Sequence, residues 1–368
     1  MAGAAPALGR ACARALRPRR GARPPQPVKT RAARGPGVLL PRGAGEPAFF
    51  PDAAYAGAEF TDDADGALAQ ADVLVCVQPP SNERLGKLKP GAVVIGLLAP
   101  HADPARVEAF VAGKLTAFPL EKLPRTTRAQ AMDVLSSQAG MAGYKAVLLA
   151  AQLAPRYFPM LTTAAGTIRP SKVLVVGAGV AGLQAIATAR RLGAQVEGFD
   201  VRPETREQIE SLGGKFLDLG VSAAGEGGYA RELTAEERAE QQRRLGEHLK
   251  SVDVVVTTAA VPGRPAPKII TAAMVAGMKP GSVVVDLAAE TGGNCEATRP
   301  GETYEQGGVT FAGPLNLASQ GAMHASEMYA RNVFNFLALS LKGGALSLDW
   351  DDELIARTCL AHAGEKRG

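Results

Sequence analysis

Residues 172–200 read KVLVVGAGVAGLQAIATARRLGAQVEGFD. The apolar run 173–176 predicts a buried strand, and the alanine-rich segment after it predicts a helix. Between them Gly177, Gly179 and Gly182 form a G-x-G-x-x-G motif. The first glycine permits a tight turn, the second lets a pyrophosphate approach the backbone, and the third lets the helix pack on the strand. This stretch therefore predicts the first β-α-β unit of a dinucleotide-binding domain.

The same unit carries the candidate cofactor contacts. Val180 and Ala181 open the helix, where amide groups and a partial positive charge favour phosphate. A second strand, 195–199, ends at Asp200, 18 residues after the third glycine. A carboxylate there accepts hydrogen bonds from both ribose hydroxyls and repels a 2′-phosphate, which favours NAD(H) over NADP(H). Arg202 argues the other way, because a cation could receive a 2′-phosphate, and a Rossmann-like domain without nucleotide is a further alternative.

Composition excludes several classes of protein. The chain has 368 residues, of which 46% are hydrophobic and 21% charged, which suits two globular domains. Its net charge is +5, but residues 1–45 carry nine Arg, one Lys and no acid, leaving 31 Lys and Arg against 36 Asp and Glu elsewhere. We therefore expect no nucleic-acid groove. Four cysteines without C-x-x-C spacing argue against a disulfide framework or a metal site and fit a reducing compartment.

Residues 1–36 are interpreted as a basic leader outside the fold. An Arg-rich, acid-free segment suits an organelle transit peptide, but such peptides are rich in serine and the first serine here is Ser81. A secretory signal would need an apolar run after its charges. Pro24, Pro25 and Pro27, among repeated Ala, Arg and Gly, show neither helical nor strand periodicity. We favour a disordered or misassigned N-terminus.

After this leader, short apolar strands alternate with helical patterns, which predicts a parallel α/β architecture. We expect two Rossmann-like domains with mainly parallel sheets, joined by long helices, with a cleft between them. Residues 37–135 with 327–368 would form a discontinuous N-terminal domain, and 140–320 the NAD(H)-binding domain. Helices over 141–153 and 320–341 would join the two. No apolar stretch reaches the roughly 18 residues needed to cross a bilayer.

Further candidates lie where predicted strands end. The strands 252–258 and 282–286 are followed by loops that converge on the nucleotide in a parallel sheet. Asp286, Glu290 and Asn294 are therefore candidates for the far side of the pocket. Tyr229 lies among glycines in a long insertion, which indicates either a mobile flap over a ligand or a surface loop whose tyrosine packs locally.

Residues 125–138 concentrate hydrogen-bonding side chains. Seven occur within 14 residues: Arg125, Arg128, Gln130, Asp133, Ser136, Ser137 and Gln138. This density has two interpretations. One is a solvated helix face with internal salt bridges; the other is a polar site at a domain junction.

Together these segments resemble the NAD(H)-binding component of proton-translocating NAD(P) transhydrogenase. The resemblance covers about residues 43–345 and rests on 125–144, 159–170, 172–200, 211–216 and 286–295. Alanine dehydrogenases share the fold and the glycine motif but lack the R-A-Q-x-M-D-x-L-S-S-Q run present here. A chain of this length without predicted membrane helices resembles the split form, whose membrane-spanning and NADP(H)-binding parts are separate subunits.

The resemblance implies that the chain binds NAD(H) and exchanges hydride with NADP(H) held on a partner subunit, coupled to proton movement through a membrane-spanning subunit. It further implies a homodimer, peripheral on the cytoplasmic face of the inner membrane through those partners. Direct transfer between two nicotinamides requires near-attack geometry and no general acid, base or metal.

The resemblance also assigns site residues. Arg125 and the Asp133/Ser136 pair would position the nicotinamide carboxamide, and Gln130 would bridge towards the NADP(H) ribose on the partner. The residues assigned to the cofactor are Gly177, Gly179, Val180, Ala181, Gly182, Asp200, Val201, Arg202, Tyr229, Thr258, Pro262 and Asp286.

Two departures from the family pattern leave two alternatives. The leader has no counterpart of the family's first strand and its following loop, and Cys76 stands where a lysine is usual. Alanine dehydrogenases use that lysine and an N-terminal arginine to bind the 2-oxo acid. The alternatives are an alanine dehydrogenase-like NAD-dependent oxidoreductase and an impaired paralogue that binds nucleotide only.

Overall fold

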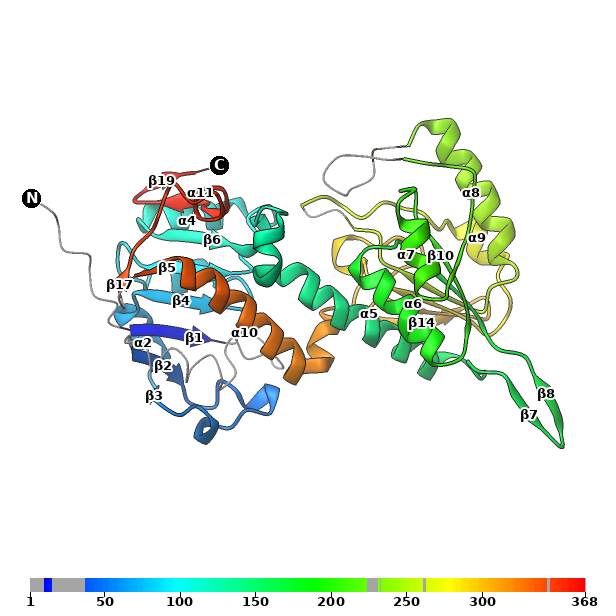
Figure 1. Ribbon diagram of the computed structural model, residues 1–368, viewed down its shortest axis with the longest axis horizontal. Helices are drawn as coiled ribbons and strands as arrows, with labels where there is room; N and C mark the ends of the chain where they lie inside the picture. Colours follow the sequence, from blue (N-terminus) through cyan, green and yellow to red (C-terminus); the bar gives the residue numbers. More distant parts are fainter. Residues whose placement is uncertain are drawn as a thin grey trace, which may run out of the picture. The chain divides into compact units, whose positions relative to one another are not determined.

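The computed structural model describes residues 10–14, 37–223, 231, 233–260, 263–342 and 345–367. The chain divides into two compact units, drawn in Figure 1: unit 1 comprises Met1–Gln138 with Ser319–Gly368, and unit 2 comprises Ala139–Ala318. Each unit contains a mainly parallel sheet with helices packed on it. The predicted class, α/β with Rossmann-like parallel sheets, is confirmed.

Unit 2 is built on a seven-stranded sheet in the order β11-β10-β9-β12-β13-β15-β14. Its strands are β9 (Lys172–Val176), β10 (Gln195–Phe199), β11 (Lys215–Phe216), β12 (Val254–Thr257), β13 (Ser282–Asp286), β14 (Thr303–Gln306) and β15 (Val309–Ala312). Neighbours pair in parallel except β14 with β15. Numbered along the chain, the parallel strands have the 3-2-1-4-5-6 order, which reverses between β9 and β12. Sheets of this kind bind ligands at that reversal, outside the carboxyl ends of the strands.

Both faces of this sheet are buried, which explains the continuous apolar runs of its strands. Val175 of β9 packs into a layer that contains α6 (Val180–Arg191), and its neighbour Leu174 packs into the opposite layer, with α8 (Ala235–Leu249). The remaining elements of the unit are the hairpin β7 (Leu161–Thr163) and β8 (Gly166–Ile168), with α7 (Thr205–Ser211) and α9 (Ala272–Ala276).

Unit 1 is built on an eight-stranded sheet in the order β19-β18-β6-β5-β4-β1-β2-β3. Its strands are β1 (Arg10–Arg14), β2 (Gly37–Pro41), β3 (Ala58–Thr61), β4 (Val73–Cys76), β5 (Val93–Gly96), β6 (Thr116–Pro119), β18 (Ala361–His362) and β19 (Glu365–Lys366). Its helices are α2 (Ala64–Gln70), α3 (Asn82–Leu85), α4 (Pro104–Ala112), α10 (Ala322–Leu339) and α11 (Glu353–Thr358). A short hairpin, β16 (Leu341–Lys342) with β17 (Ala345–Leu346), follows α10.

Strand β1 differs from the interpretation of residues 1–36 as a leader outside the fold. Arg10–Arg14 pairs in parallel with β2 on one side and β4 on the other, with Cys12 opposite both Leu39 and Leu74. Its five residues, RACAR, are too short to show a period within a segment rich in Arg and Pro. Backbone pairing with two existing strands, rather than an apolar pattern, defines this strand.

Helix α10 is tied to the sheet of unit 1 by a buried tyrosine. Tyr329, fully buried, donates its hydroxyl hydrogen to the carbonyl of Cys76 at 2.6 Å and accepts from the amide of Leu97 at 3.1 Å. One hydroxyl thus satisfies polar backbone groups after β4 and at the end of β5, where neither continues a ladder.

Helix α5 (Val134–Leu153) begins seven residues earlier than the predicted helix 141–153. Its start is explained by Asp133, whose Oδ1 accepts from the amide of Ser136 at 2.9 Å, a standard N-cap interaction. Further along, a Cβ on Gly143 would lie 2.0 Å from the carbonyl oxygen of Ala181. Only glycine permits α5 to pack this closely against the first turn of α6.

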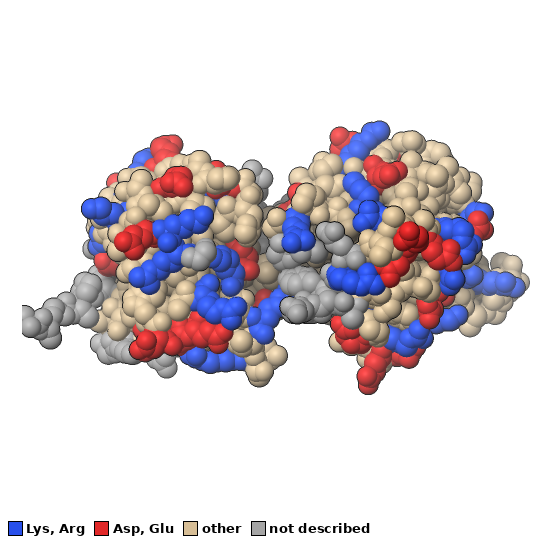
Figure 2. Space-filling view, turned by 90° about the horizontal axis from the view of Figure 1, so that it is seen from above, with Lys and Arg blue, Asp and Glu red and all other residues tan. Residues whose placement is uncertain are grey.

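Charged side chains of both signs are spread over the visible face of each unit (Figure 2). Many form local ion pairs; on α8, Arg243 binds Glu240 through Nε and Nη2, both at 2.9 Å. Such exposed pairs contribute little to stability, typically under about 1 kcal/mol. The charged surface of α8 is therefore a solvated helix face.

Candidate nucleotide-binding site

Each glycine of the motif is required for a different physical reason. Gly177 has φ +96°, a conformation that side chains rarely adopt. A Cβ on Gly182 would lie 1.8 Å from the carbonyl oxygen of Gly177, so the helix could not approach the turn. A Cβ on Gly179 would meet no atom within 4 Å. That open space above the backbone is what a pyrophosphate needs, so the loop fits a dinucleotide.

Helix α6 presents its N-terminus at this loop. Gly179 is the N-cap, in an extended conformation and without a side chain to cap the helix. The amides of the first turn, at Val180, Ala181 and Gly182, therefore face the N-terminal end with the helix's partial positive charge. Val180 is 46% exposed. The arrangement suits an anionic group.

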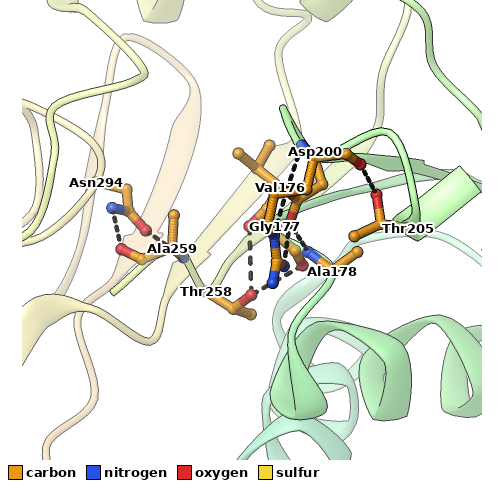
Figure 3. A network of polar contacts seen from close by, with 9 residues as sticks. Val176, Gly177, Ala178, Asp200, Thr205, Thr258, Ala259 and Asn294 are labelled. Carbon is orange, nitrogen blue, oxygen red and sulfur yellow. Dashed lines mark hydrogen bonds and ion pairs between the residues drawn. The ribbon is translucent and has the colours of Figure 1, made fainter. Parts of the chain in front are cut away.

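Asp200 directly follows β10 and lies against the glycine loop (Figure 3). Its Oδ2 accepts from the amide of Ala178 and from Nη2 of Arg202, both at 2.7 Å. Its Oδ1 accepts from the amide and from Nε of Arg202, both at 2.9 Å. Burial opposes ionisation, but these hydrogen bonds outweigh it and lower the pKa of Asp200. The carboxylate is ionised at neutral pH.

The loop after β12 is held to the glycine loop and to the loop after β13 (Figure 3). Thr258 donates from Oγ1 to the carbonyl of Gly177 at 2.9 Å. Asn294 accepts from the amide of Ala259 at 3.0 Å and donates to its carbonyl at 2.7 Å. Asn294 is fully buried. It therefore fixes one wall of the site from behind, instead of lining the pocket as its position after a strand suggested.

Asp286 occupies a similar supporting position. It is 1% exposed, and its carboxylate accepts from the amides of Ala288 at 2.9 Å and Cys295 at 3.0 Å and from Oγ1 of Thr298 at 2.5 Å. Its hydrogen-bonding capacity is used by its own loop. Glu290 is likewise engaged, with the amide of Asn316. Asp286 thus shapes the strand-end loop, and a direct contact with the cofactor stays a prediction.

The polar segment 125–138 belongs to unit 1, whereas the glycine loop belongs to unit 2. Asp133 and Ser136 are brought together, because Oδ2 of Asp133 also accepts from Oγ of Ser136 at 2.6 Å. Arg125 and Gln130 are exposed, Gln130 within a 3-10 turn, Thr127–Met132. Asp133 and Ser136 thus form a capped pair at the start of α5.

Two asparagines that the sequence did not single out anchor this segment. Asn332 and Asn335 of α10 each donate from Nδ2 to the carbonyl of Ala131 at 2.9 Å. Gln138, which is buried, donates to the carbonyl of Ala325 at 3.1 Å. The i, i+3 spacing of the two asparagines, which places both on one helix face, is the signal that could have identified them.

Arg128 instead pairs with Asp352 at the surface, so the segment is partly the solvated face that one interpretation predicted. Val201 is partly buried, and its carbonyl accepts from the amide of Ala223 at 2.7 Å. Tyr229 and Pro262 lie outside the described residues. Among the residues that the structure describes, no group of three or more His, Cys, Asp or Glu could hold a metal ion.

Comparison with known families places the chain in a defined class. Residues 14–142 match the family described as alanine dehydrogenase/PNT, N-terminal domain, and residues 146–367 match alanine dehydrogenase/PNT, C-terminal domain. The chain therefore belongs to the alanine dehydrogenase/PNT family.

Within this family the chain groups with the transhydrogenases, as the resemblance predicted. The NAD(P) transhydrogenase subunit alpha of Rhodospirillum rubrum is 44% identical over 353 residues, 92% of each chain. That of Haemophilus influenzae is 39% identical over 336 residues, 89% of this chain and 65% of the other. An alanine dehydrogenase of Mycobacterium tuberculosis is 31% identical over 288 residues, 76% of this chain and 70% of the other.

Solved structures agree with this grouping. A transhydrogenase structure from Sinorhizobium meliloti matches with a TM-score of 0.88 at 43% identity, over 97% of this chain and 99% of that one. An L-alanine dehydrogenase structure matches with a TM-score of 0.79 at 23% identity, over 97% and 96% of the two chains, and shares the fold.

We expect Gly182→Ala to destabilise the protein and Gly179→Ala to leave its stability unchanged. The first substitution places a methyl group 1.8 Å from a backbone oxygen, whereas the second meets open space. Overpacking of this kind costs about 1–3 kcal/mol. Urea unfolding followed by circular dichroism measures the difference. Equal midpoints for the two variants would contradict the close loop–helix contact.

Proposed function

We propose that this chain is the NAD(H)-binding component of a proton-translocating NAD(P) transhydrogenase. It would exchange hydride directly with NADP(H) on a partner subunit. The observation that carries the proposal is the complete glycine loop closed by Asp200, in a chain 44% identical to a transhydrogenase subunit alpha over 92% of its length.

The charges beside the loop support NAD(H) as the nucleotide bound here. Asp200 is ionised and only 8% exposed, so a 2′-phosphate next to it would suffer like-charge repulsion in a poorly solvated place. Arg202, the cation that could receive such a phosphate, is paired with Asp200 at 2.7 Å. Its charge is already compensated.

Hydride transfer between two nicotinamides assigns the chain a binding and positioning task. NAD(H), when bound, supplies the hydride chemistry itself. The amides of Val180 to Gly182 would hold the pyrophosphate, and Asp200 the adenosine ribose. Arg125 with the capped pair Asp133 and Ser136 would hold the nicotinamide carboxamide, and the exposed Gln130 would reach the NADP(H) ribose of the partner. Tyr229 and Pro262 are proposed to flank the same nucleotide.

The alternative of an alanine dehydrogenase is less well supported. The position where those enzymes hold a lysine is Cys76, whose thiol is fully buried and lies 3.7 Å from the carbonyl of Ile95. Burial raises the pKa of this thiol, so it is neutral and offers no positive charge to a 2-oxo acid. The alternative of an impaired paralogue rested on a missing first strand, and β1 fills that position between β2 and β4.

Partners follow from the same proposal. In the part of the chain that the structure describes, no helix has the length and apolar character to cross a membrane. Proton movement would therefore require a membrane-spanning subunit, and hydride exchange an NADP(H)-binding subunit. These would hold the chain on the cytoplasmic face of the inner membrane.

The hairpin β7–β8 supports a homodimer. It extends away from the sheet of unit 2 (Figure 1), and Met160 and Ile168 at its base are 65% and 44% exposed. An open hollow of about 550 Å³ lies beside it, lined by Pro155, Arg156, Tyr157 and Ile168. Exposed apolar groups on a projecting hairpin are suited to a second copy of the chain. We propose that this arm contacts the partner copy.

The purified chain should bind NADH at least about tenfold more tightly than NADPH, because the ionised Asp200 disfavours a 2′-phosphate. Gly179→Ala should weaken NADH binding by a similar factor, since its methyl group fills the space above the loop. Quenching of NADH fluorescence or calorimetry gives both affinities. Equal binding of the two nucleotides would contradict the assignment to NAD(H).

Gln130→Asn should reduce NADH-to-NADP⁺ hydride transfer about tenfold when partner subunits are added, a loss of roughly 1.4 kcal/mol of transition-state stabilisation. NADH affinity of the isolated chain should change less than about twofold, because the bridging contact exists only in the complex. Gln208→Asn, on the exposed face of α7, is the matched control. Substantial transfer by the chain alone, or an unchanged rate in Gln130→Asn, would contradict the bridging role.

Replacing both Met160 and Ile168 by glutamate should convert the dimer to a monomer, because it places charges in an apolar contact. Light scattering coupled to size exclusion reports the mass. Phe49→Glu, at a 73% exposed position of unit 1, should remain dimeric. A monomeric wild-type chain or a dimeric hairpin variant would rule out this arm as the interface.

A further inference from the structure

The carboxylate of Asp200 is fully engaged within the protein. An ionised carboxylate offers about four acceptor positions on its two oxygens. Four donors occupy them: the amides of Ala178 and Arg202, and the Nε and Nη2 groups of the Arg202 side chain, at 2.7 to 2.9 Å. Two hydroxyl groups can be added only if two of these donors leave.

The two side-chain donors are the ones that can leave. The amide of Ala178 belongs to the turn that the glycine packing holds, and the amide of Arg202 is two residues from the carboxylate in the same chain. The guanidinium, in contrast, stands on a flexible side chain that is 19% exposed. Its Nε–H and Nη2–H present two parallel donors to the two oxygens, as a vicinal diol does.

We propose that Arg202 is an internal substitute for the adenosine ribose and thereby a specificity-determining residue of the site. This inference rests on the proposed binding of NAD(H) at Asp200. In the free protein the guanidinium edge holds the carboxylate in place. The ribose hydroxyls take over its two positions when the nucleotide binds, and the arginine side chain turns away.

This exchange opposes binding and sharpens selectivity. NADH must break a partly buried ion pair, which lowers its affinity. NADPH would gain the released cation as a partner for its 2′-phosphate but would place that phosphate beside the ionised Asp200. Arg202 therefore weakens NADH binding and strengthens NADPH binding, and its removal shifts the two affinities in opposite directions. A general loosening of the loop would shift both in the same direction.

The test compares NADH affinities of wild type, Arg202→Gln and Arg243→Gln by titration at physiological salt. Arg243 is the matched control, because it makes the same two-pronged pair with Glu240 on the exposed surface of α8 and its loss changes the net charge equally. We expect Arg202→Gln to bind NADH about threefold or more tightly than wild type, and Arg243→Gln to bind it unchanged. Arg202→Lys, which keeps the charge but lacks the fork, should also tighten binding and serves if Arg202→Gln fails to fold.

Asp200→Asn provides the second arm, with NADPH as probe. Its arginine is no longer held by a charge, so NADPH should bind at least about fivefold more tightly than to wild type, and the double variant Asp200→Asn/Arg202→Gln should lose that gain. Weaker or unchanged NADH binding by Arg202→Gln and Arg202→Lys would overturn the substitute role. A double variant that retains the gain would overturn the specificity role. Absence of NADH binding by wild type and every variant would instead refute the proposed function.

Discussion

The contact between the backbones of Gly177 and Gly182 is the constraint on which the site depends. Because no side chain intervenes, α6 starts within van der Waals distance of the turn that ends β9, and its first amides are directed at the space above Gly179. Gly143 repeats the device on the other side, where α5 reaches the carbonyl of Ala181. A phosphate-binding loop made of backbone alone keeps its geometry only if its neighbours are this close.

The polar groups around the loop divide into those that build it and those left for a ligand. Thr258, Asn294 and Asp286 spend their hydrogen bonds on backbone groups of neighbouring loops and are buried. Buried loops contain amides and carbonyls that no ladder satisfies, so such side chains are needed where strands end. Asp200 combines both tasks, because one of its donors is the loop amide of Ala178 and two are the exchangeable groups of Arg202.

Much of this could be predicted from the sequence, because apolar runs and glycine spacing are local signals. The strands from β4 onwards, the motif and the position of Asp200 follow from them. Three features could not. β1 is defined by pairing with distant strands, the start of α5 depends on the capping hydrogen bond of Asp133, and the supporting roles of Asp286 and Asn294 depend on which atoms happen to face them. A strand-end polar residue looks the same in sequence whether it faces a ligand or a neighbouring loop.

Helix α5 connects these levels. Its first residues follow the cap formed by Asp133 and Ser136, the pair proposed to hold the nicotinamide end, and seven residues beyond Ser136 the same helix packs on α6 through Gly143. A helix rises about 1.5 Å per residue, so the two points are about 10 Å apart along one rigid element. The pair has no loop of its own to adjust its position. Its distance along the helix from the Gly143 contact is therefore fixed by the helix, and the sequence can alter it only by changing the number of residues between Ser136 and Gly143.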